Sequence, residues 1–138
     1  MSRCTVSPLL RFALRIDAVA SAASGVAMSA APAALHDRTG IPAALLLGAG
    51  VFCLGYAALI FYMSTRARLP AAAVWAVVLG NLGWAAGCLV LAFDVTPMPS
   101  ALGVAFLVAQ GGAVAVFAAL QFLGLKRSPA AALAAAHA

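Results

Sequence analysis

Four apolar segments, each about as long as a membrane-spanning helix, constrain this chain more than any other feature of its sequence. A hydrocarbon core about 30 Å thick needs about 20 helical residues, because each residue adds about 1.5 Å. The links LHDRTGI, STRARLP and DVTPMPS are short and favour antiparallel neighbours. The pattern predicts an all-α, four-helix transmembrane bundle with up-down topology, with spans at about residues 8–34, 42–63, 71–93 and 101–125.

Composition supports a membrane protein with a single domain. Charged residues make up 8% of the chain and the mean hydropathy is +1.11. A water-soluble domain carries about a quarter charged residues, so this chain has too little polar surface for water. We expect a membrane domain over residues 1–127, followed by an alanine-rich cytoplasmic tail over residues 128–138. The lipid bilayer is its first expected partner.

The basic residues predict the orientation of the bundle. In the four-span arrangement, Arg38 lies on one side with Asp37 and Asp94. The other side carries Arg3, Arg11, Arg15, Arg66, Arg68, Lys126 and Arg127. Because Lys and Arg concentrate in cytoplasmic loops, both termini are predicted to be cytoplasmic in a multi-pass protein of the bacterial inner membrane. The net charge of +5 forms no clustered basic face, so no nucleic acid is expected to bind.

The first 34 residues allow a second interpretation, a cleaved signal peptide. They have a basic start, an apolar middle and an AxA-like end, as such peptides do. Asp17 interrupts the apolar middle, however, and cleavage would leave three spans. We therefore expect this segment to be retained as the first span.

Asp17 is the one acidic residue within the predicted spans. At about 100° per residue, Asp17, Ser21 and Ser24 share one helix face, whereas Arg15 points nearly the opposite way. A carboxylate that faces lipid costs several kcal/mol, so this face must meet protein or water. Asp17 is then either a proton or cation site, or a polar anchor that holds the first helix against its neighbours.

Two amides are expected to meet in the middle of the membrane. Asn81 lies near the middle of the third span, in LGNLGWAAG, and Gln110 lies at a similar predicted depth in the fourth. An amide in hydrocarbon needs a hydrogen-bond partner. A hydrogen bond between Asn81 and Gln110 is therefore predicted, with a polar substrate site at mid-membrane as the alternative.

A second polar cluster is expected nearer the cytoplasmic side. Gln121 shares a face of the fourth helix with Gln110, because the two are eleven residues apart. Its depth is similar to that of Asp17. Asp17, Gln121 and either Tyr56 or Tyr62 are therefore predicted to form a cluster there, although Tyr62 also fits an interfacial anchor.

Glycines in the second and fourth spans indicate close contacts between helices or an oligomer face. These glycines are Gly48, Gly50, Gly55, Gly111 and Gly112. Their spacing does not distinguish the two roles.

The sequence contains no enzyme motif. It has no Walker loop, HExxH, GxSxG or paired intramembrane acids. His36 and His137 are far apart, and Cys4, Cys53 and Cys88 have no CxxC spacing, so neither a metal site nor a structural disulfide is predicted. We expect a protein without catalytic residues, metal or cofactor.

The four short spans, with LRIDAVAS in the first and LGNLGWAAG in the third, resemble a group of small bacterial integral membrane proteins of uncharacterised function. In size and span number the chain is also similar to DoxX-like proteins and to the small multidrug resistance exporters. Those exporters carry an essential glutamate in their first span, whereas this chain has no Glu, and Asp17 replaces it only by analogy. The resemblance implies a bacterial inner membrane and assigns no functional residue.

Two functions of different classes follow from these features. The first is a non-enzymatic accessory or structural subunit of a membrane assembly, bound to another membrane protein; a homo-oligomer is expected for the second. It rests on the short loops and the glycine-lined helix faces. The second is a small proton-coupled transporter or exporter that works as an oligomer, with Asp17 as the coupling residue. It rests on the polar residues within the spans.

Overall fold

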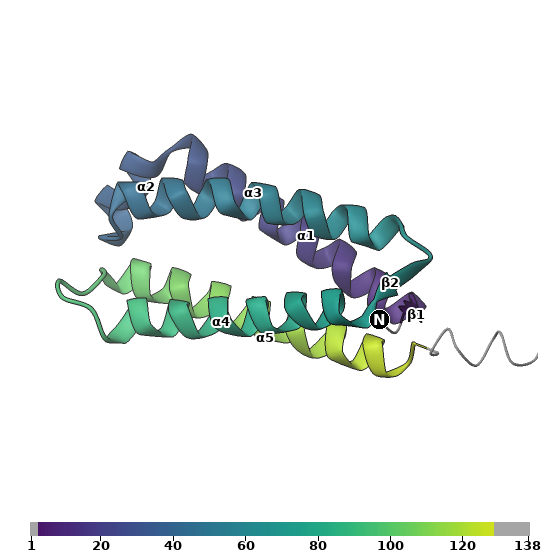
Figure 1. The fold of residues 1–138 in the computed structure, drawn as a ribbon. Helices are drawn as coiled ribbons and strands as arrows, with labels where there is room; N and C mark the ends of the chain where they lie inside the picture. The colour runs from purple at the N-terminus through teal and green to yellow at the C-terminus, as the bar shows by residue number, and fades with distance from the viewer. Residues whose placement is uncertain (1–2, 129–138) are drawn as a thin grey trace, which may run out of the picture.

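The computed structural model describes residues 3–128, which form five helices and two short strands (Figure 1). The helices are α1 (Pro8–Ala30), α2 (Pro32–Thr39), α3 (Ala43–Thr65), α4 (Ala71–Phe93) and α5 (Ala101–Lys126). The strands are β1 (Arg3–Thr5) and β2 (Arg68–Pro70). The predicted all-α class is confirmed, with a two-stranded ribbon added to it. Residues 129–138 of the predicted tail lie outside the described residues.

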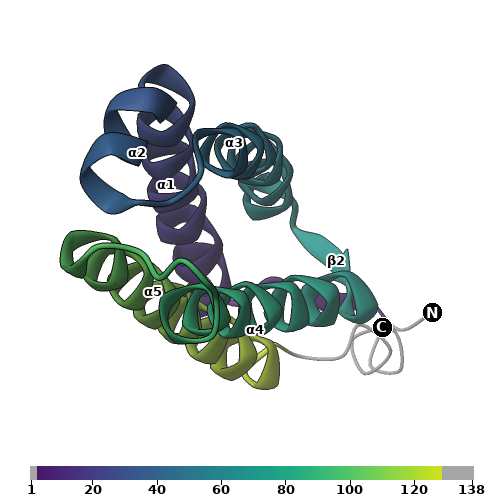
Figure 2. The same cartoon turned by 90° about the vertical axis from the view of Figure 1, so that its left-hand side faces the viewer.

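The long helices form two packed pairs. α1 packs along α3, and α4 packs along α5, while α1 also crosses onto α5 and joins the pairs. α3 and α4 follow one another in the chain but make few contacts along their lengths. Figure 2 shows them standing apart, with α1 and α5 meeting on the other side of the bundle. The structure is therefore closed on the α1–α5 side and open between α3 and α4.

Three to four helices are able to cross a membrane. α3, α4 and α5 are each long and apolar enough, and the pair α1–α2 makes a fourth span if its bent halves count as one. The outward faces carry large apolar side chains, among them Val51, Leu79 and Val116, each more than half exposed. Such faces suit lipid and not water, as a multi-pass membrane protein requires.

The first predicted span, residues 8–34, is not one continuous helix. α1 ends at Ala30, and α2 follows at an angle of 92°. The cause is Pro32, because proline lacks a backbone N–H and disfavours helical geometry in the preceding residue. Ala31 accordingly has φ −142° and ψ 53°. The predicted link LHDRTGI is largely helical. α2 ends at Thr39, and the cap residue Gly40 follows with φ 71°, the left-handed conformation typical of helix C-termini.

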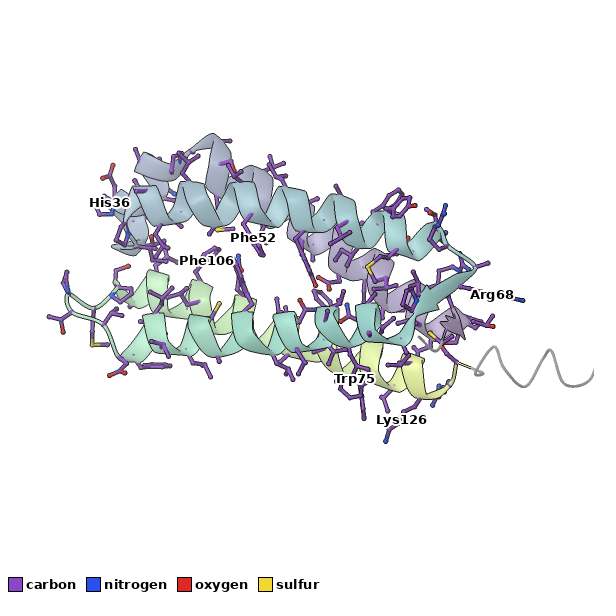
Figure 3. All side chains as sticks on the ribbon, in the orientation of Figure 1. His36, Phe52, Arg68, Trp75, Phe106 and Lys126 are labelled. Atoms are coloured by element: carbon purple, nitrogen blue, oxygen red, sulfur yellow. The ribbon has the colours of Figure 1, made fainter. Side chains whose placement is uncertain are left out.

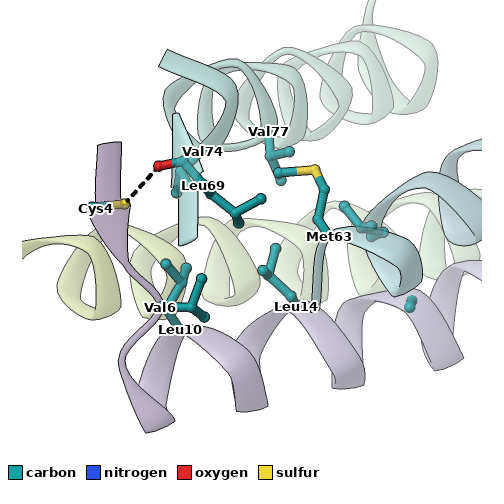
Figure 4. Packing of buried hydrophobic residues seen from close by; sticks show 10 residues of the cluster. Cys4, Val6, Leu10, Leu14, Met63, Leu69, Val74 and Val77 are labelled. Carbon is teal, nitrogen blue, oxygen red and sulfur yellow. Dashed lines mark hydrogen bonds between the residues drawn. The ribbon is translucent and has the colours of Figure 1, made fainter. Parts of the chain in front are cut away.

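A small ribbon at the opposite end of the bundle fixes the N-terminus. β1 and β2 pair antiparallel, with Cys4 opposite Leu69. The Cys4 thiol donates to the Leu69 carbonyl at 3.5 Å, above a core that includes Leu10, Leu14 and Val74 (Figure 4). Burial raises the pKa of the Cys4 thiol. The predicted link STRARLP is thus partly a strand, and it holds the start of α1 beside the start of α4.

Candidate functional site

The Asp17 side chain lies at the centre of the bundle and is fully buried. The face of α1 that carries it turns inward, and its immediate neighbours on that face, Ala13, Leu14 and Ala18, are also buried. Arg15 is exposed on another face, as predicted. A buried carboxylate costs free energy unless several donors satisfy its oxygens. The side chains around Asp17 supply them.

Three neutral groups donate hydrogen bonds to the Asp17 carboxylate, and a fourth, the Tyr56 hydroxyl, lies beside it. Oδ1 accepts from the Ser21 hydroxyl at 3.1 Å, one turn along the same helix. Oδ2 accepts from Asn81 Nδ2 at 2.8 Å and from Gln121 Nε2 at 2.7 Å. The Tyr56 hydroxyl lies 3.2 Å from the same oxygen. Since α1, α3, α4 and α5 each contribute a group, this carboxylate connects all four long helices.

Asn81 closes the network around the carboxylate. Its Nδ2 has two hydrogens, which reach Asp17 Oδ2 and, at 3.0 Å, Gln121 Oε1. Its Oδ1 accepts from the Tyr56 hydroxyl at 2.7 Å, the shorter of that hydroxyl's two contacts. The reversed amide orientation would place an oxygen against the carboxylate. Every polar group of Asn81 is therefore used inside this network, which we call the Asp17 network (Asp17, Ser21, Tyr56, Asn81, Gln121).

The predicted hydrogen bond between Asn81 and Gln110 is wrong. Asn81 bonds to Gln121, whereas Gln110 Oε1 accepts from the Trp84 indole N–H at 3.3 Å. The structure thus merges Asn81 with the predicted cluster of Asp17, Tyr56 and Gln121. It leaves the Gln110 Nε2 amide buried without a hydrogen-bond partner among the described residues.

Tyr62, the alternative member of that cluster, is absent from it. Its side chain is exposed, and the Arg66 guanidinium lies over its ring, 4.9 Å from the centroid. This position near the end of α3 fits the predicted interfacial anchor.

A small cavity adjoins the Asp17 network, and we call it the inner cavity. It has a volume of about 140 Å³, and Ser24 lines it together with Ser21, Tyr56 and Asn81. Three groups beside the carboxylate thus also face this space. Ser24, predicted on the Asp17 stripe, contacts the cavity and not the carboxylate.

A larger apolar cavity, here the outer cavity, lies beside the inner one. Its volume is about 520 Å³, and its walls come from α1, α3, α4 and α5. Figure 3 shows Phe52 and Phe106 in the space between the two helix pairs. The two cavities share Phe52, Trp84 and Gln110. The rings of Phe52 and Trp84 stack with centroids 5.7 Å apart, so this pair forms the partition between the cavities.

Sequence reasoning missed the role of Phe52 and Trp84. Both lie inside apolar runs where an aromatic residue signals only burial or lipid contact, and nothing in a single span shows that the two rings meet.

The described residues include no group of three or more His, Cys, Asp or Glu placed to hold a metal ion. All three cysteines are free and buried.

Comparison of the chain with protein-family models, with curated proteins and with solved structures gives no match. The resemblance seen in the sequence therefore stays a prediction. The functional argument rests on the Asp17 network and the two cavities.

Proposed function

We propose that the protein is a non-enzymatic accessory or structural subunit of a membrane assembly. Its spans run up and down through a bacterial inner membrane, with both termini in the cytoplasm. The observation that carries the proposal is the enclosure of Asp17. A coupling residue has to exchange protons with water or a ligand, whereas this carboxylate is fully buried and already has four protein groups within hydrogen-bond distance. Such saturation suits a residue that holds helices together.

Further support comes from the surfaces available for other chemistry. The connections between the long helices are short, and the polar side chains inside the bundle bond mainly to one another. A protein built in this way offers its helix faces, and not its loops, to other molecules. Helix faces are the surfaces through which membrane subunits associate.

Gentle solubilisation of the native membrane tests this proposal. We expect another membrane protein to co-purify in a fixed ratio with the full chain. Asp17→Asn should lower the recovery of that partner, because the helix pairs lose the group that joins them. Asp94→Asn, which changes an exposed acid outside the helices, should leave recovery unchanged. Purification of the native protein only as a complex with itself would contradict the proposal.

A proton-coupled transporter is the second candidate, and one specific observation favours it. Ser21, Tyr56 and Asn81 bond to Asp17 and also line the inner cavity, so a molecule there lies one hydrogen bond from the carboxylate. In proteoliposomes, Asp17→Asn should then abolish proton-coupled flux of cations, while Asp37→Asn keeps it. Unchanged flux in Asp17→Asn would remove this candidate.

A further inference from the structure

We propose that the two linked cavities bind an uncharged amphiphile with a single apolar chain. The chain lies in the outer cavity, and a hydroxyl or carbonyl head lies at Gln110 and the inner cavity. This inference goes beyond the proposed function, since it holds for a subunit and for a transporter alike. It rests on the shape of the cavities, the chemistry of their walls and an unused hydrogen-bond donor between them.

The outer cavity suits a flexible apolar chain. Its lining is apolar except for the Gln110 amide and the Trp84 indole N–H, which bond to each other. Its walls include the buried side chains of Met28, Leu46 and Leu107, each no more than 6% exposed, and its volume is about 520 Å³. An α-helix with side chains is about 10–12 Å wide, which requires an open groove. A single hydrocarbon chain needs no such width, and it enters between α3 and α4, whose backbones stay apart although their side chains meet at the Phe52–Trp84 stack.

The head is recognised where the two cavities meet. Gln110 lines both cavities, its Oε1 accepts from Trp84, and its Nε2 is buried without a partner among the described residues. A buried amide N–H without a partner costs about 1–3 kcal/mol, and a ligand oxygen would remove that cost. Beyond Gln110 lie the hydroxyl groups of Ser24 and Tyr56. The site therefore offers donors and hydroxyl groups to a small oxygen-containing head.

The charge of the site favours a neutral head. Neither cavity has a Lys or Arg among its lining residues, so an anionic head would have no counter-ion. The nearby Asp17 carboxylate would also repel it. A cationic head gains little, because protein donors already occupy that carboxylate and Asp17 does not line either cavity. An uncharged head avoids both penalties.

Glycines keep the outer cavity open. Gly48, Gly83 and Gly87 line it, and a Cβ added at any of them would meet no atom within 4 Å. Larger side chains at these positions would fill the cavity without displacing its walls. Gly112 of α5 is equally free of neighbours but lines neither cavity. This residue provides a matched control for the substitutions that fill the cavity.

Quenching of Trp84 fluorescence tests the proposal. The experiment uses the full-length Trp75→Phe variant, in which Trp84 is the only tryptophan. This variant is placed in phosphatidylcholine nanodiscs. The probes are a nitroxide-labelled stearoyl methyl ester and the matched stearate at alkaline pH. We expect saturable quenching by the ester, and the probe concentration at half-maximal quenching should be about tenfold lower for the ester than for the anion. Gly83→Leu combined with Gly87→Leu should abolish saturation, and Gly112→Leu should retain it.

The head contact is tested separately. Gln110→Leu should weaken binding of the ester by about fivefold, because the ester carbonyl loses the amide donor. Three results would overturn the proposal: quenching that never saturates, equal affinity for ester and anion, or unchanged quenching in the Gly83→Leu/Gly87→Leu protein. The last would mean that the probe reports ordinary lipid. The quenching experiment measures neither co-purification nor flux, so its failure can be distinguished from failure of the proposed function.

Discussion

At the scale of single residues, the Asp17 carboxylate explains why an apolar bundle contains so many polar side chains. Each of Tyr56, Asn81 and Gln121 would be costly alone in hydrocarbon, and so would Asp17. Together they satisfy one another, and each group comes from a different helix. The network therefore specifies how the helices face each other, which apolar packing in lipid does weakly.

The unequal use of the two mid-span amides leads to a prediction. Asn81→Leu should lower the free energy of unfolding by about 1–3 kcal/mol, because Tyr56 and Gln121 lose partners while Asp17 loses a donor. Gln110→Leu should cost less, because it breaks one hydrogen bond, from the Trp84 indole N–H at 3.3 Å, and its Nε2 has no partner among the described residues. Unfolding of both variants in mixed micelles by increasing denaturant measures the difference. Equal losses would mean that the Asp17 network adds nothing to the fold.

Much of this network was predictable from one helix at a time. The helical repeat places Ser21 beside Asp17, and similar depth brings Gln121 and Tyr56 to it. The partner of Asn81 was not predictable in the same way. Depth along each helix does not show which of two amides on the same face of α5 its neighbour on α4 will reach. In the structure Asn81 bonds to Gln121, and Gln110 bonds to Trp84 instead.

At the scale of helices, close approach at particular glycines determines the packing. Gly124 of α5 lies against the start of α1, where an added Cβ would come within 2.7 Å of the Leu10 backbone. Ser7 reinforces this contact, because its hydroxyl accepts from Leu10 N–H as the α1 cap and donates to the Gly124 carbonyl at 2.7 Å. Of the glycines predicted at contacts, Gly50 and Gly111 have close neighbours across helices, whereas Gly48, Gly55 and Gly112 have none.

The contact at Gly124 gives a prediction for the α1–α5 pair. Gly124→Ala should destabilise the protein by roughly 1–3 kcal/mol, because the new methyl group meets backbone atoms that cannot move aside. Gly112→Ala on the same helix should be neutral or stabilising by up to about 1 kcal/mol, the gain in helix propensity. Thermal unfolding of the two variants in the same detergent compares them. A similar response at both sites would show that α1 and α5 are not in close contact.

The break at Pro32 is visible in the sequence, whereas the contact of Arg11 with the end of α3 is not. Pro32 is a visible helix breaker, yet the apolar run continues past it and suggests one span. Arg11 was interpreted only as a topology signal. In the structure its guanidinium donates to the Ser64 carbonyl at 2.9 Å and to the Arg66 carbonyl at 3.4 Å, at the C-terminal end of α3. A cation there satisfies carbonyls that the helix leaves free, and only the tertiary fold shows which helix end it meets.

At the scale of the whole molecule, the ends of the bundle differ in charge. The β1–β2 ribbon and the contact of Ser7 with Gly124 bring the start of α1 and the end of α5 together. At the other end, the Ser100 hydroxyl donates to the Arg38 carbonyl and the Ser100 backbone N–H donates to the Thr39 carbonyl. These two bonds join α2 to the start of α5. Figure 3 places Arg68 and Lys126 at the first end and His36 at the second. The basic residues that predict orientation therefore belong largely to one end.

This asymmetry gives a prediction for the whole chain in its native membrane. Cys4, Cys53 and Cys88 are buried, so a cysteine introduced at an exposed position is the one that a maleimide reaches. Met98→Cys, between α4 and α5, should react with a membrane-impermeant maleimide in intact spheroplasts. Ala67→Cys, between α3 and β2, should react only after the membrane is permeabilised, because Arg66 and Arg68 beside it predict a cytoplasmic position. The unsubstituted chain is the control for background labelling. Labelling in the reverse order would place the basic end outside, and the Arg and Lys pattern would then reflect binding to anionic lipid and not the direction of insertion.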